Sequence, residues 1–155
     1  MNFTLSNLNG VAECLPTLAQ WHHQQWSYLN PGQSLQVRIN RMAKCLGEAL
    51  IPSTVVALQK GKPLGSASIV ASDMDSHPEL TPWLASVYVA PEFRGQGLGS
   101  ALVKDIMQSA KLDGVKTLYL FTPDQQVFYQ RLGWETYSEE SYRGVSVTIM
   151  QCELF

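Results

Sequence analysis

Three glycines, Gly95, Gly97 and Gly99, lie where an apolar segment that ends near Val89 gives way to a helical pattern. Glycine lets backbone N–H groups approach an anion closely. The first turn of a helix also leaves N–H donors unpaired and carries a partial positive charge. Together these features predict a site for a phosphate or pyrophosphate, and hence for a nucleotide-like ligand.

Three known types of phosphate-binding loop can be compared with this glycine-rich stretch, and two of them match it poorly. A Walker loop needs Lys followed by Ser or Thr after its last glycine, and Leu98-Gly99 stands there instead. A dinucleotide fingerprint would begin at Gly95, directly after a strand, and would need Gly or Ala where Ser100 stands. Asp124, after the next strand, would suit a ribose ligand, so that alternative stays open. The glycines could also serve only a tight turn.

The third loop type fits better. Arg94, Gly97 and Gly99 match the pattern Q/R-x-x-G-x-G/A, and Phe128-Tyr129-Gln130-Arg131-Leu132-Gly133-Trp134 follows downstream. With these two motifs the chain resembles the GNAT superfamily of N-acetyltransferases, and its expected element order is also that of the family. The resemblance implies an acetyl-CoA-dependent N-acetyltransferase. The rival hypothesis is a non-catalytic acyl-CoA-binding module that acts as a sensor or partner protein.

The resemblance also implies where acetyl-CoA binds. It would lie in a gap where two strands separate, and backbone groups of Val87, Tyr88 and Val89 would bind the pantetheine arm and the acetyl carbonyl. Plain core packing is an alternative role for Val87 and Val89. The pyrophosphate would be held by the loop residues Arg94, Gly95, Gln96, Gly97, Leu98, Gly99 and Ser100.

The resemblance suggests Tyr129 as the catalytic acid, because family members often carry a Tyr in the helix before an L-G-F/W turn. When an amine attacks the thioester, coenzyme A leaves as a thiolate, which a positioned phenol can protonate. An amide on the strand, that of Val89, could stabilise the oxyanion that develops on the acetyl carbonyl. The alternative is that Tyr129 is a half-buried core aromatic.

A general base is harder to assign, because the strand expected over Val115 to Thr122 contains no acid. We take Glu79, just before another strand, as the first candidate. The weaker candidates are Asp73, Asp75, His77, His22 and His23. The acidic loop around Asp73 predicts a small or peptide-borne primary amine as the acceptor. The aromatic residues that could form the wall of an acceptor pocket are Trp21, Trp26 and Trp83.

These residues need a scaffold, and the apolar periodicity supplies one. Helices are expected over Val11 to Tyr28, Ser34 to Leu46, Gly97 to Leu112 and Asp124 to Leu132, with Pro16 in a first turn and Ser34 and Asp124 as N-caps. Strands are expected over Ser53 to Gln59, Leu64 to Ala71, Trp83 to Val89, Val115 to Thr122, Trp134 to Tyr137 and Val145 to Cys152, and the first residues could form an edge strand. This order predicts an α/β (α+β) fold. The resemblance implies a single N-acetyltransferase domain over residues 1–155. The resemblance adds a central mixed, mostly antiparallel sheet with splayed strands.

Composition excludes several other classes of function. The 155 residues carry a net charge of −2, which argues against a nucleic-acid partner or an anionic membrane surface. The N-terminus lacks the pattern of a signal peptide, so we expect a cytoplasmic protein. The cysteines Cys14, Cys45 and Cys152 lie far apart, so we expect reduced thiols, no metal and no acyl-enzyme. The exposed edges of the last strands could pair in a homodimer.

Overall fold

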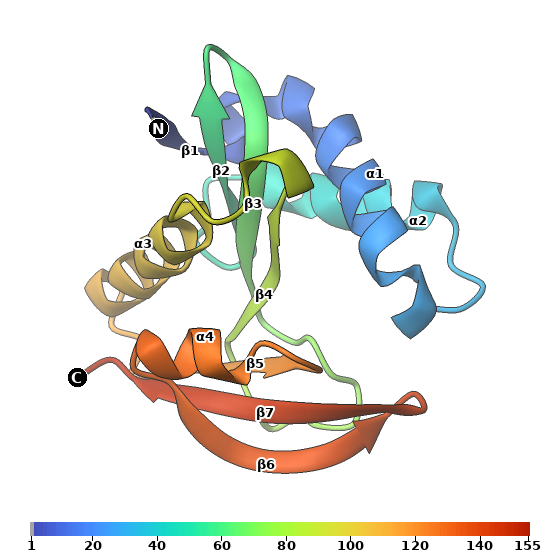
Figure 1. Cartoon of the computed structure of the whole chain (residues 1–155), viewed down its shortest axis with the longest axis vertical. Coiled ribbons are helices and arrows are strands. Elements are labelled where there is room, and N and C mark those ends of the chain that lie inside the picture. The colour runs from blue at the N-terminus through green and yellow to red at the C-terminus, as the bar shows by residue number, and fades with distance from the viewer. Residues whose placement is uncertain (1) are drawn as a thin grey trace.

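A computed structural model describes residues 2–155 and shows one sheet of seven strands in the order β1-β2-β3-β4-β5-β7-β6 (Figure 1). Within these residues every neighbouring pair is antiparallel except β4 and β5. The strands are β1 (Thr4–Asn7), β2 (Ser53–Gln59), β3 (Lys62–Val70), β4 (Trp83–Val89), β5 (Thr117–Thr122), β6 (Glu135–Tyr142) and β7 (Val145–Glu153). The expected mixed, mostly antiparallel α/β fold is therefore confirmed.

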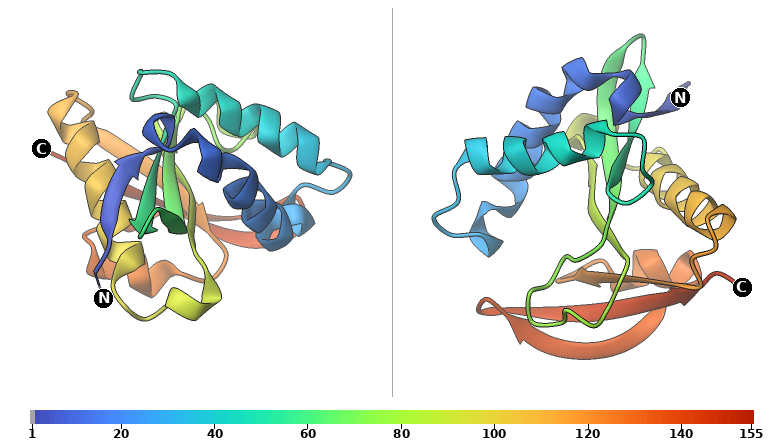
Figure 2. Two further views of the ribbon diagram at one scale, coloured as in Figure 1. Left: turned by 90° about the horizontal axis from the view of Figure 1, so that it is seen from above. Right: turned by 180° about the vertical axis from the view of Figure 1, so that it is seen from behind.

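Helices cover both faces of the first half of the sheet. The α-helices are α1 (Leu15–Trp26), α2 (Leu35–Ala43), α3 (Leu98–Leu112) and α4 (Gln126–Arg131). Short 3-10 turns flank them: η1 (Leu8–Gly10), η2 (Ala12–Cys14), η3 (Ser27–Leu29), η4 (Lys44–Leu46) and η5 (Pro91–Phe93). Seen from above, α3 lies on one side of the strands and α1 and α2 lie on the other (Figure 2).

The pattern of β2 explains why it is buried on both faces. Val55 and Ala57 belong to the apolar cluster under α3, whereas Val56 and Leu58 belong to the cluster under α1 and α2. Successive strand residues point to opposite faces, so an uninterrupted apolar run suits a strand covered by helices on both sides. The helices are thereby fixed to the sheet through two separate cores.

The main irregularity of the sheet is in β4. The register of β3 and β4 shifts between Ser66 and Ser68, and Ser86 opposite this shift has φ of 54°. This is a β-bulge, which bends a strand and redirects its backbone groups. Beyond it, Gly65 pairs with Val89, and a Cβ on Gly65 would collide with the Tyr88 carbonyl oxygen. The close approach of β3 to the end of β4 therefore requires glycine at position 65.

The sheet divides after the first residue of β4. Trp83 pairs with Tyr119 on β5, and the Tyr119 N–H donates to the Pro82 carbonyl at 3.1 Å. No later residue of β4 pairs with β5 within residues 2–155. Figure 1 shows β5, β7 and β6 running crosswise to β2, β3 and β4. The expected splayed strands are thus present, and their gap lies beside the segment from Ser86 to Val89.

Three details differ from the sequence-based expectations. Asp124 does not cap α4; instead the Thr122 hydroxyl accepts from the N–H groups of Asp124 and Gln125 at 3.4 and 3.0 Å. The strand expected over Trp134 to Tyr137 extends to Tyr142, because it pairs with β7 along most of its length. The first long helix begins at Leu15, after a 3-10 turn, while Pro16 and the Ser34 N-cap lie as expected.

Within residues 2–155, no helix has the length and apolarity needed to cross a membrane.

Replacing Gly65 tests the close approach of β3 and β4. We expect Gly65→Ala to lower the free energy of unfolding by about 1 to 3 kcal/mol, because the new Cβ must displace the backbone of Tyr88. The measurement is urea unfolding followed by circular dichroism. Gly47→Ala is the matched control, because Gly47 has φ of −76° and no atom within 4 Å of an added Cβ. Equal stability of the two variants would contradict the close approach.

Candidate active site

A cleft of about 1090 Å³ opens where β4 and β5 separate. Ligand pockets commonly measure about 300 to 1,000 Å³, so this one suits a large ligand or two ligands together. One side is lined by the start of α3 and by α4, including Gly97 and Tyr129. The other side is lined by α1, α2 and the loop 71–82, including Trp26, Arg38 and Asp73. The cleft therefore has a glycine-rich end and an end rich in charged residues.

The glycine loop lies at the first end. Gly95 and Gly97 have φ of 78° and 84°, in the left-handed region that favours glycine. Gly97 is the N-cap of α3, and no side chain accepts from the first-turn N–H groups. These donors and the helix dipole favour an anion there. Of the loop residues expected to hold a pyrophosphate, all except Gln96 line the cleft.

Gly99 brings the two helices of this end together. A Cβ at this position would lie 3.4 Å from the ring of Phe128 and 3.9 Å from the side chain of Val89. The small residue thus lets α3 start close to both α4 and the end of β4. The downstream Phe-Tyr motif and the glycine motif, which are separate in sequence, meet at this contact.

Arg94 fixes the loop to the strand before it. Its Nε donates to the Val89 carbonyl at 2.8 Å, and its guanidinium lies 5.6 Å from the centre of the Tyr88 ring. A planar cation over an aromatic face is favourable. The side chain of Arg94 therefore braces the loop against the end of β4.

The backbone of Val89 is directed into the gap. The Ala90 N–H donates to the Leu64 carbonyl at 2.9 Å, while Gly65 is the register partner of Val89. In an antiparallel ladder this makes Gly65 and Val89 a non-hydrogen-bonded pair, so the Val89 N–H points away from β3. Val87, Tyr88 and Val89 all line the cleft. The strand thus offers an amide donor on the side where β5 separates.

Tyr129 lies in α4 at the inner wall of the cleft. Its ring packs edge-on against Phe128 and Trp134, with centroids 5.0 and 6.1 Å away. Only 8% of the residue is exposed. Burial raises the pKa of Tyr129, which keeps the phenol protonated at neutral pH. The packing holds a proton donor in the cleft.

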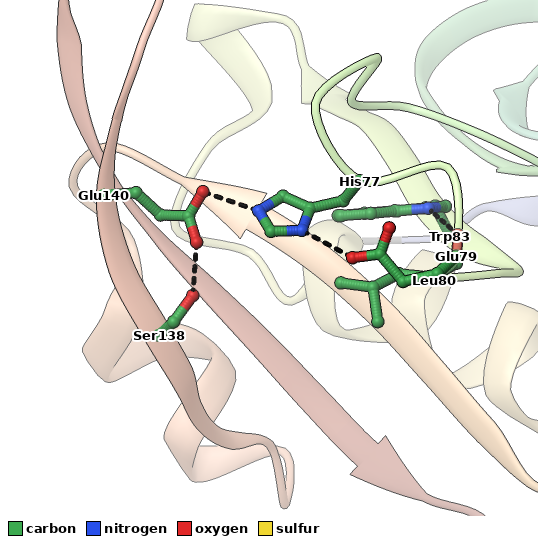
Figure 3. Close-up of polar contacts among 6 residues, drawn as sticks. All are labelled: His77, Glu79, Leu80, Trp83, Ser138 and Glu140. Atoms are coloured by element: carbon green, nitrogen blue, oxygen red, sulfur yellow. Dashed lines mark hydrogen bonds and ion pairs between the residues drawn. The ribbon is translucent and has the colours of Figure 1, made fainter.

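The structure does not bring Glu79 to the cleft, contrary to its assignment as the base. Its carboxylate contacts His77 Nδ1 at 2.8 Å, and His77 Nε2 contacts Glu140 on β6 at 2.6 Å (Figure 3). Ser138 donates to the other oxygen of Glu140 at 2.8 Å. Hydrogen bonds to Glu140 and Glu79 raise the pKa of His77, and those bonds lower the pKa of both carboxylates. Glu79, whose side chain is 59% exposed, belongs to a surface contact that joins the loop 71–82 to β6.

Asp73 is one of two carboxylates of that loop that line the cleft. Burial raises its pKa to about 7, although Arg41, Arg143 and Arg38 act in the opposite direction. Asp75 also lines the cleft, but Arg143 donates to it at 3.0 Å. Arg143 also donates to the Leu29 carbonyl and the Asn30 side chain, at 3.1 and 2.6 Å. The loop, the β6–β7 turn and the end of α1 are therefore joined at the rim.

The other candidates from the sequence have different positions. His22 is buried in the cleft wall with Nε2 3.0 Å from the Ser66 hydroxyl, and burial lowers its pKa to about 3, so it stays neutral. Trp26 lines the cleft, whereas Trp83 is fully buried and donates to the Leu80 carbonyl at 2.7 Å (Figure 3). The ring centroid of Trp21 lies 5.7 Å from that of Tyr88. Trp21, His23 and His77 do not line the cleft.

Sequence reasoning missed the arginines of the cleft, Arg38, Arg41 and Arg143. The spacing of Arg38 and Arg41, three residues apart on an amphipathic helix, was the only signal that could have found two of them. The structure describes no group of three or more His, Cys, Asp or Glu within residues 2–155 that could hold a metal ion.

The segment that carries this cleft also matches a known family. A family model for the acetyltransferase (GNAT) domain matches residues 52–136, which is more than half of the chain. The chain belongs to the GNAT acetyltransferase family. The match includes β4, the glycine loop, α3 and Tyr129, so the cleft described above is formed largely by the family's own segment.

Individual relatives agree with this GNAT membership. An uncharacterized N-acetyltransferase of Gracilaria tenuistipitata var. liui is 36% identical over 63 residues, which are 40% of this chain and 34% of that relative. The chloroplastic GCN5-related N-acetyltransferase 2 of Arabidopsis thaliana is 44% identical over 50 residues, which are 32% of this chain and 19% of that relative. The matched stretches therefore span about a third and about a fifth of these curated proteins.

A solved GNAT structure shares the whole fold. The phosphinothricin acetyltransferase of Sinorhizobium meliloti, in complex with AcCoA, superimposes with a TM-score of 0.75 at 22% identity. The alignment covers 99% of this chain and 89% of that one. The likeness therefore includes α1 and α2, which lie outside the family-model match.

Proposed function

We propose that this protein transfers the acetyl group of acetyl-CoA directly to the primary amine of a small-molecule or peptide acceptor. The observation that carries the proposal is the single cleft that joins an anion-binding glycine loop to a buried, protonated Tyr129. A solved GNAT neighbour was determined with AcCoA, which agrees with this choice of donor. A module that only binds acyl-CoA would not need a protonated phenol held in the cleft.

The residues of the cleft fit the parts of acetyl-CoA. We assign the pyrophosphate to the amides between Gly95 and Ser100, where the left-handed glycines leave open space. The pantetheine arm and the thioester would follow β4 along Val87 and Val89. The Val89 N–H then has the orientation needed to stabilise the negative charge that develops on the acetyl oxygen.

The transfer requires two proton movements. The amine nitrogen attacks the thioester carbon, the C–N bond forms, and the C–S bond breaks. We assign Tyr129 to protonate the departing sulfur, because burial keeps its phenol neutral. We assign Asp73 to accept the proton that the amine loses, directly or through water, because it lines the cleft and its pKa is close to neutral pH.

A direct transfer is favoured over an acyl-enzyme. Cys45 is the cysteine that lines the cleft, and the pKa of its thiol is raised by burial despite a hydrogen bond from Thr54. A thiol held in its neutral form is a poor nucleophile. No covalent intermediate on the protein is therefore proposed.

The glycine loop can be tested by adding a charge to it. We expect Gly97→Glu to abolish acetyl-CoA binding measured by calorimetry, because a negative side chain would occupy the pyrophosphate site. We expect the unaltered protein to bind acetyl-CoA far more tightly than NAD or ATP. Gly61→Glu is the matched control, since Gly61 has a similar φ of 76° and equally open space but lies in the β2–β3 turn outside the cleft. Equal or tighter binding of NAD would contradict the assignment.

The acid role of Tyr129 can be tested by removing only its hydroxyl. With the best acceptor from an amine panel, we expect Tyr129→Phe to lower kcat by about a hundredfold or more and to leave acetyl-CoA affinity nearly unchanged. The assay follows release of the coenzyme A thiol. Tyr137→Phe, on the exposed β6 strand, should retain full activity. An unchanged kcat in Tyr129→Phe would make this residue part of the packing, and bound acetyl-CoA without turnover of any amine would favour the binding module.

The base can be tested through the pH profile. A carboxyl with a raised pKa of about 7 is protonated at lower pH, so below pH 7 it should add a fall in kcat/KM of about tenfold per pH unit to the slope that protonation of the amine itself causes. We expect Asp73→Asn to remove the part of this fall that the free amine's own protonation does not explain, and to lower kcat/KM by about a hundredfold at pH 8. Glu79→Gln is the control and should keep the profile of the unaltered protein. If Glu79→Gln caused these changes and Asp73→Asn did not, Glu79 would be the base instead of Asp73.

A further inference from the structure

Two arginines of α2, Arg38 and Arg41, line the second end of the cleft. Arg38 and Arg41 lie three residues apart, which brings their side chains close together on one face of the helix. Arg38 is only 8% exposed, and its Nε is buried with no hydrogen-bond partner among residues 2–155. Because a buried polar group without a partner is costly, this donor is expected to meet an acceptor atom from outside the chain.

The charges around Arg38 leave this end of the cleft positive. Arg38, Arg41 and Lys44 line it from α2 and η4. Of the carboxylates in the adjacent loop, Asp75 is already paired with Arg143. Asp73 is left, and even when it is ionised it offsets only one of the three positive charges of Arg38, Arg41 and Lys44. The acidic loop that pointed to a purely cationic acceptor is therefore outweighed by residues from a different part of the chain.

Arg38 is also close to the segment where transfer is proposed to occur. Its charge contributes to lowering the pKa of His22, which contacts the Ser66 hydroxyl on β3. Ser66 is the register partner of Tyr88, beside the bulge of β4. The charge of Asp73 in turn raises the pKa of Arg38, and both residues line the same cleft as Tyr88. An anion bound at Arg38 would hold an attached amine near the β3–β4 segment and near Asp73.

We propose that the acceptor is an amino acid, a small molecule that carries a carboxylate next to its primary amine, and that Arg38 binds this carboxylate with the help of Arg41. The proposal rests on the proposed function, because it assigns this anion site to the acceptor of that reaction. A guanidinium can donate two parallel N–H bonds to one carboxylate, which fixes both its position and its orientation. Trp26 completes the wall at the same end. The carboxylate thereby positions the amine for attack.

Matched acceptors separate the effect of the carboxylate from that of the amine. The assay measures thiol release from acetyl-CoA with free amino acids and with their C-terminal amides, which keep the amine and lose the negative charge. Spermidine and kanamycin serve as amines without a carboxylate, and phosphoethanolamine as an amine with a phosphate. We expect kcat/KM for the best amino acid to exceed that for its amide by about thirtyfold or more.

Variants of the arginines then assign the preference to the site. We expect Arg38→Gln to raise KM for the amino acid by about thirtyfold or more, with a smaller change in kcat and no change for the amide. Arg41→Gln, at an exposed position, should give a smaller rise in KM, and it keeps the test valid if Arg38→Gln does not fold. Arg131→Gln is the control, because this exposed cation lies outside the cleft.

A second readout tests the anion site without turnover. N-acetyl amino acids, the products of the reaction, should raise the melting temperature more than their amides do, and Arg38→Gln or Arg41→Gln should remove the difference. Faster turnover of amides, spermidine or kanamycin would overturn the amino-acid proposal and leave the acetyltransferase intact. Faster turnover of phosphoethanolamine than of the amino acids would overturn the proposal that the anion is a carboxylate. Stabilisation by the N-acetyl acids without turnover of any amine would support the anion site and overturn the proposed transfer.

Discussion

The separation of β4 from β5 after Trp83 is the constraint on which the rest of this structure depends. A continuous sheet would pair the backbone of Val87 and Val89 with a neighbouring strand, and no cleft would exist. The bulge at Ser86 bends β4, and Gly65 lets β3 follow the bent strand closely. The Val89 N–H is consequently left to a ligand. Most of β4 is unpaired along its β5 edge, although its other edge pairs with β3. The apolar burial under the helices on both faces compensates for these missing hydrogen bonds.

The glycine loop and the proton donor reach the same cleft through contacts that the separated strands permit. Arg94 fixes the loop to the Val89 carbonyl, and Gly99 allows the ring of Phe128 to lie against the start of α3. Tyr129 is the next residue, so the close contact of the two helices also positions its hydroxyl. The positions of the glycine loop and of Tyr129 are therefore set by one small region of packing.

The parts of the fold and site that local chemistry determines could be predicted from the sequence. The strand Trp83–Val89, the Ser34 cap and the helix after Gly97 follow from apolar periodicity, side-chain capping and glycine. The position of Glu79 outside the cleft could not be predicted, for a different reason. Its partner His77 is itself held by Glu140, 63 residues further along the chain, and no spacing rule reveals that contact. The buried Arg38 was missed in the same way, because its environment is formed by segments that meet only after folding.

The separate cores on the two faces of the sheet have a consequence for how such a protein can diverge. The cluster under α1 and α2 includes Val56 and Leu58 of β2, whereas the cluster under α3 includes Val55 and Ala57 of the same strand, and the two clusters share no residue. Substitutions on the cleft side of α2 therefore leave the packing beneath the glycine loop undisturbed. Selection can therefore change the residues on the α2 side of the cleft while the glycine-loop side stays constant. The architecture thus permits a lineage to exchange one substrate for another without rebuilding its scaffold.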